Sequence, residues 1–80
     1  MKIKIWGVTS ADTVYTRLYE NVTKYEIKPE YEWYDYEEEI IGFDLIIYQG
    51  NKKIVEDLSI NTTFSYDNKE KQLYVEFHDY

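Results

Sequence analysis

Residues 24–33 alternate strictly between two kinds of side chain. One set is aromatic, aliphatic or proline, and the other is lysine or glutamate. A period of two is typical of a β-strand with one buried face. Pro29 cannot donate a hydrogen bond to a ladder, so we expect the strand to lie at a sheet edge or to bulge there. The pattern therefore predicts an edge strand whose rings, Tyr31 and Trp33, face the core.

A helix over residues 29–41 is the competing interpretation. It would begin at Pro29, carry Trp33, Tyr36 and Ile40 on one stripe, and end just before Gly42. The alternation begins before the proline, and aromatic density suits a sheet, so the strand is favoured. After Trp33 the alternation slips, which indicates a bulge or turn.

Five further segments resemble strands. Residues 2–8 alternate, residues 43–48 are a short apolar run, and the segment 49–52 is predicted to turn into a strand over 53–60. The last hairpin is expected to pair residues 62–66 with residues 72–78 through a polar turn.

One helix is predicted over residues 10–22. Ser10 offers a capping hydroxyl, and Val14, Leu18 and Val22 follow at helical spacing. The β-branched and aromatic residues at 13–16 are the weak point of this interpretation. The predicted fold class is α+β: a single domain over residues 1–80, with a largely antiparallel twisted sheet of about five or six strands and the helix packed on one face.

The composition limits the cellular setting and the ligands. The chain has no cysteine, so packing alone must hold the core, and neither a secretory leader nor an apolar span is visible. We expect a cytoplasmic protein without membrane contact, in the host cytoplasm if a phage encodes it. The lysines are scattered rather than gathered in a stripe, so direct binding of nucleic acid is not expected.

No catalytic or metal motif stands out. His78 is the only histidine, and the three serines lack a nucleophile elbow or glycine-rich context. The glutamates at 37–39 are dense in oxygen but fit no calcium loop, and no phosphate-binding glycine pattern occurs. We expect neither enzyme activity nor a cofactor.

The acidic aromatic run EYEWYDYEEE is the candidate functional segment. Residues 30–39 carry six of the chain's 16 acids and no base, so the run holds −6 of the net −7. Repulsion between carboxylates about 7 Å apart costs about 0.6 kcal/mol per pair before screening by salt, a noticeable burden for a small domain. Exposed rings beside acids are expected where a protein meets a basic partner. The predicted binding residues are Glu30, Glu32, Tyr34, Asp35, Tyr36, Glu37, Glu38 and Glu39.

The predicted function is an interaction module that docks on and blocks a basic protein, such as a nuclease or another nucleic-acid-binding enzyme. One strand places same-face acids too sparsely to imitate a duplex, so a second row of acids or steric plugging by the rings would be needed. The protein is expected to be a monomer or a weak homodimer. Two alternatives stay open: an aromatic platform for carbohydrate, and a self-associating structural protein.

In size and acidic character the chain resembles the small inhibitors that phages and mobile elements direct against host nucleases, including anti-CRISPR and anti-restriction proteins. Those families share little sequence with one another. The resemblance covers general character and carries over no individual residue.

Overall fold

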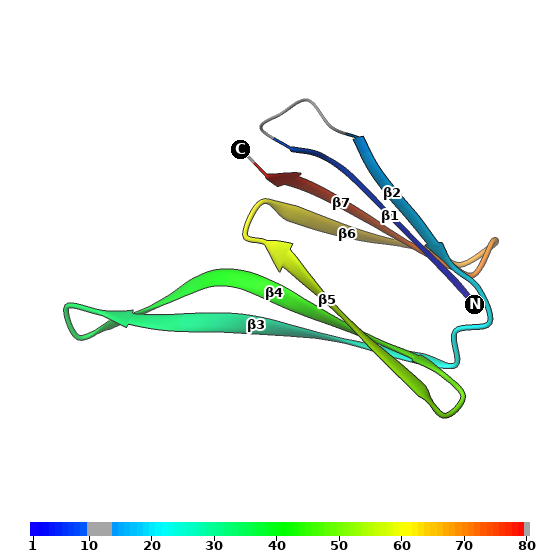
Figure 1. The fold of residues 1–80 in the computed structure, drawn as a ribbon, viewed down its shortest axis with the longest axis horizontal. Helices are drawn as coiled ribbons and strands as arrows, with labels where there is room; N and C mark the ends of the chain where they lie inside the picture. The colour runs from blue at the N-terminus through cyan, green and yellow to red at the C-terminus, as the bar shows by residue number, and fades with distance from the viewer. Residues whose placement is uncertain (10–13, 80) are drawn as a thin grey trace.

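Two β-sheets pack face to face in the computed structural model, which describes residues 1–9 and 14–79 (Figure 1). The strands are β1 (Lys2–Thr9), β2 (Val14–Tyr19), β3 (Lys24–Tyr34), β4 (Glu37–Gln49), β5 (Lys52–Ser59), β6 (Thr62–Asp67) and β7 (Gln72–Asp79). One sheet has the order β2-β1-β7-β6 and the other has the order β3-β4-β5. Neighbouring strands are antiparallel, except that β1 and β7 run parallel.

The predicted α+β class is wrong, because the described residues contain no helix and form two sheets rather than one. Within the predicted helix, residues 10–13 lie outside the described part of the chain, and Val14–Tyr19 is β2. This strand pairs with β1 from Ile3↔Tyr19 to Val8↔Val14. Its β-branched and aromatic residues favour that ladder, and the ladder outweighs the helical spacing of the apolar positions.

The other strand predictions are confirmed with small changes at their ends. β4 is longer than expected, because it begins at Glu37 instead of at residue 43. The alternative helix over residues 29–41 is wrong, since β3 continues to Tyr34 and a two-residue turn joins it to β4. Pro29 lies on the edge strand β3, as predicted, and the ladder shifts register between Glu30 and Tyr31.

The core lies between the two sheets. It combines residues of β1 and β7 with residues of β4 and β5, and it includes Val22 from the β2–β3 connection. Its members are Ile3, Ile5, Val22, Leu45, Ile47, Leu58, Leu73 and Val75. Most are β-branched or aliphatic residues of the kind that suits a pleated and buried surface.

Side-chain contacts also join the sheets beside this core. Arg17 of β2 donates to Glu56 of β5 at 3.1 Å, and the Tyr19 hydroxyl also donates to the Glu56 carboxylate. Phe43 of β4 meets Phe64 of β6 edge to face, with 5.7 Å between the ring centroids. These contacts hold β5 and β4 against the other sheet, whereas the far half of β3 extends beyond it (Figure 1).

The hairpin of β3 and β4 therefore projects from the sandwich (Figure 1). Every residue from Tyr31 to Ile41 is exposed. The radius of gyration is 13.8 Å, whereas about 12 Å is typical of a compact domain of this length. The longest dimension of the molecule, 42 Å, reflects the same projection.

Truncating a core side chain should lower the stability of the protein more than truncating a side chain of the projecting hairpin. Leu45→Ala removes a fully buried side chain and should lower the free energy of unfolding by about 2–5 kcal/mol. Trp33→Ala removes a larger side chain that is 71% exposed, and should cost less than about 1 kcal/mol. Urea titration of both variants measures the difference, and an equal loss would show that Trp33 belongs to the core.

Candidate functional site: a projecting acidic hairpin

The candidate site is the outer part of the β3–β4 hairpin, residues 30–40, called the arm below. At its foot Glu30 pairs with Gly42, whereas the next residue, Tyr31, pairs with Ile40. Ile41 is thus left without a cross-strand partner, which is the pattern of a β-bulge. From this bulge outward the two strands pair only with each other.

The tip of the arm is a two-residue turn in a costly conformation. Asp35 and Tyr36 have φ angles of 49° and 66°. A two-residue hairpin turn with both φ angles positive favours Asn-Gly or Asp-Gly, because the left-handed region penalises a side chain with a Cβ. Asp35 suits the first position of this turn. The second position is occupied by Tyr36, although glycine would adopt its φ angle with the least conformational strain. The Tyr36 side chain is 99% exposed, so no packing within the protein offsets this cost.

The arm has two different faces, because directly opposite residues of paired strands point to the same side. Tyr31 faces Ile40 and Trp33 faces Glu38 across the ladder. These four residues, called the inner face below, continue the side of the sheet on which Leu45 and Ile47 are buried. The opposite side, called the outer face below, has the cross-strand pairs Glu32↔Glu39 and Tyr34↔Glu37, with Glu30 at its foot.

Apart from Glu38, the inner face is apolar, and the second sheet does not cover it. Tyr31 is 52% exposed, Trp33 71% and Ile40 40%. The prediction that the rings of residues 31 and 33 face the core is right in direction but wrong in burial, because the second sheet does not extend over them. These three residues were absent from the predicted binding set. The sequence carries no signal for their exposure, because it depends on how far the opposing sheet extends.

The outer face concentrates negative charge in two adjacent rows. Glu30 and Glu32 lie on β3, while Glu37 and Glu39 lie on β4. Glu32 and Glu39 are directly opposite, an arrangement that destabilises a sheet when both charges have the same sign. Among the ion pairs of the described side chains, none includes a carboxylate of residues 30–40, and the nearby bases Lys24 and Lys28 both contact Glu26 instead.

The predicted binding residues are therefore brought to one projection but not to one face. Glu30, Glu32, Tyr34, Glu37 and Glu39 share the outer face, whereas Glu38 lies on the inner face. Asp35 and Tyr36 form the tip. The arrangement offers recognition chemistry, namely charge, ring surfaces and hydroxyls, rather than a nucleophile beside a base.

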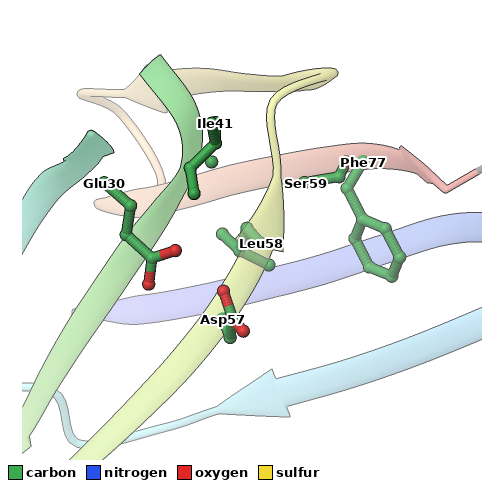
Figure 2. Close-up of a pocket in the computed structure, with 7 residues that line it drawn as sticks. Glu30, Ile41, Asp57, Leu58, Ser59 and Phe77 are labelled. Carbon is green, nitrogen blue, oxygen red and sulfur yellow. The ribbon is translucent and has the colours of Figure 1, made fainter. Parts of the chain in front are cut away.

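A second feature lies at the foot of the arm, where each strand of the smaller sheet supplies one carboxylate. Oxygens of Glu30, Asp44 and Asp57 lie within 4.8 Å of one another. Glu30 and Asp57 also line a shallow hollow of about 340 Å³ beside Gly42, Leu58 and Phe77 (Figure 2). Sequence reasoning missed this cluster, because it depends on the register of three strands.

The cluster affects the protonation of Glu30. A hydrogen bond with the Asp44 carboxyl raises the pKa of Glu30, and burial and the charges of Asp44 and Asp57 raise this pKa further. Carboxylate oxygens can serve as ligands of Ca²⁺, but calcium takes six to eight oxygens and three acids alone do not define a site. What the cluster does chemically is raise the pH at which Glu30 loses its proton.

No protein-family model, curated protein or solved structure matches this chain. In residues 1–9 and 14–79 there is no helix with the length and apolar character required to cross a bilayer.

The raised pKa of Glu30 predicts a pH-dependent stability. The folded pKa lies above the unfolded one, so the contribution of Glu30 to stability is complete below the unfolded value and is lost as pH rises through the folded value. Glu30→Gln imitates the protonated acid and should raise Tm at pH 7. This advantage should shrink as pH falls toward 4.5, as calorimetry at several pH values can measure. Glu20→Gln, on the β2–β3 connection, is the control for charge; an equal rise of Tm in both variants would exclude the cluster as the cause.

Proposed function

We propose that the protein is an interaction module whose arm docks on a basic surface of another protein and blocks it. The single observation that carries this proposal is that the arm combines several destabilising features that the fold of the sandwich does not require. It holds six carboxylates, a like-charged cross-strand pair, a tyrosine in a left-handed conformation and three uncovered apolar side chains. Local strain and exposed rings of this kind are concentrated at recognition sites.

The negative charge of the arm favours a positively charged partner. Its net charge is −6, while the rest of the chain carries −1. A surface of this sign attracts a positively charged partner at long range and repels an acidic one. Grooves that bind nucleic acid are the most basic surfaces common among proteins, so a nuclease or another nucleic-acid enzyme is the proposed partner class. The resemblance to phage-encoded inhibitors agrees with this proposal.

The arrangement of the arm does not favour the two alternatives. A carbohydrate platform of Trp33, Tyr34 and Tyr36 does not form one surface, because Trp33 and Tyr34 are consecutive in a strand and point to opposite faces. Self-association through the arm would bring two surfaces of −6 together. Sedimentation at increasing concentration tests that alternative independently.

Affinity capture from a lysate of the native host tests the proposal. Immobilised protein should retain basic nucleic-acid-binding proteins at 50 mM salt, and 500 mM salt should release them. A chain lacking residues 31–40, with Glu30 joined to Ile41 through Asn-Gly, is the control for the arm. Equal retention by this control would contradict the proposal.

Neutralising three acids should separate binding from stability. The triple variant Glu37→Gln, Glu38→Gln, Glu39→Gln should bind the captured protein about 3- to 150-fold more weakly at low salt, if each charge contributes about 0.2–1 kcal/mol. Its Tm should stay equal or rise, because repulsion along the arm is relieved.

The matched control neutralises three acids outside the arm: Glu20→Gln, Glu70→Gln and Glu76→Gln. Both triple variants change the net charge from −7 to −4. Calorimetry and a salt titration of affinity measure the difference. Equal weakening by the two variants would show that overall charge, not the arm, attracts the partner.

Tyr36→Gly should change stability and binding in opposite directions. Glycine adopts positive φ without strain, so the free energy of unfolding should rise by about 1 kcal/mol. Binding should weaken, because the most exposed ring of the arm is lost. Urea titration and affinity measurement together test this prediction, and unchanged affinity would exclude Tyr36 from the interface.

A further inference from the structure

We propose that the arm imitates a single strand of nucleic acid, so that its partner is a groove built for single-stranded DNA or RNA. This inference rests on the proposed function and names the class of partner for the same site. The observation behind it is that the two faces of the arm differ: the outer face carries Glu30, Glu32, Glu37 and Glu39, whereas the inner face carries three apolar side chains and one carboxylate, Glu38.

Single strands and duplexes expose different surfaces. A duplex stacks its bases inside and presents phosphates at both rims, so a duplex mimic needs charge over its exposed surface. A single strand exposes charged phosphates along one side and flat base surfaces that proteins bind by stacking. The arm likewise has four carboxylates and one ring, Tyr34, on its outer face, and two rings, Tyr31 and Trp33, with one carboxylate, Glu38, on its inner face.

The dimensions of the arm favour a narrow groove. Carboxylates two residues apart on one strand are about 6.7 Å apart, and the two rows are separated by about 5 Å. Both rows thus lie on a ribbon two strands wide, whereas the major groove alone separates the rims of a duplex by about 12 Å. The arm can enter a groove that admits one nucleic-acid chain.

The inner face of the arm requires apolar or aromatic side chains on the other wall of that groove. Tyr31, Trp33 and Ile40 are neighbours across the ladder or two residues apart along β3, so they form one continuous apolar strip. Grooves for single strands combine basic side chains that follow the backbone with aromatic side chains on which bases stack. A purely basic surface for a duplex would leave this strip without a counterpart.

Trp33 and Tyr34 are a matched pair for testing the inference. They are adjacent and almost equally exposed, at 71% and 70%, but they lie on opposite faces. Trp33→Ala should weaken binding of the captured protein by about 5- to 150-fold, the range for loss of one stacked ring, with little change in salt dependence. Tyr34→Ala should weaken it several-fold less. Leu18→Ala, half exposed on β2, is the control outside the arm.

Displacement from immobilised DNA provides the direct test. Lysate of the native host is bound to single-stranded DNA cellulose and to double-stranded DNA cellulose, and each matrix is washed with excess wild-type protein or with a variant. We expect the wild type to release proteins from the single-stranded matrix. Release should be reduced more by Trp33→Ala than by Tyr34→Ala, and should be lost with Glu32→Gln combined with Glu39→Gln.

The possible outcomes separate this inference from the proposed function. Release from the double-stranded matrix alone, or equal loss with Trp33→Ala and Tyr34→Ala, would overturn the single-strand inference and leave a basic partner in place. Release from neither matrix, together with salt-sensitive capture of basic proteins, would also overturn only the inference. Absence of any salt-sensitive capture would overturn both.

Discussion

Burial between the two sheets is the interaction on which the rest of the structure depends, and its limited extent matters as much as its presence. Ile3 and Ile5 of β1 meet the aliphatic residues of β4 and β5 there, and all are nearly inaccessible to solvent. The outer part of the β3–β4 hairpin projects beyond the opposing sheet (Figure 1). The hairpin continues past that sheet with the same apolar side, so an ordinary strand pattern becomes an exposed surface.

The strands were predictable where local pattern and tertiary environment agree. The alternation of residues 24–33 predicted β3 with an error of one residue, because the period of two is a property of the strand itself. The helix over residues 10–22 failed because helical spacing in a short segment is weak evidence. The ladder that β2 forms with β1 is a long-range contact that no local window contains. The division into two sheets was inaccessible for the same reason.

The candidate site was predictable in its position along the chain but not in its faces. The acids of residues 30–39 marked the segment, and the slip of the alternation after Trp33 marked the turn. Whether Tyr31 and Trp33 are buried depends on how far the opposing sheet reaches, which composition does not encode. The cluster of Glu30, Asp44 and Asp57 likewise depends on the register of three strands. Strand pairing, rather than residue type, thus converts one acidic run into an acidic face and a face on which apolar side chains surround one carboxylate, Glu38.

Fluorescence quenching tests most directly the central claim that the arm is uncovered in the free protein and covered by its partner. The chain has two tryptophans, so Trp6→Phe leaves Trp33 as the only reporter. We expect acrylamide to quench Trp33 strongly in the free protein and weakly after the captured partner is added. The companion variant Trp33→Phe, measured with enough partner to saturate it, reports on Trp6 in the sandwich, whose quenching should not change. A Trp33 that is shielded in the free protein, or equally quenched with and without the partner, would contradict the account.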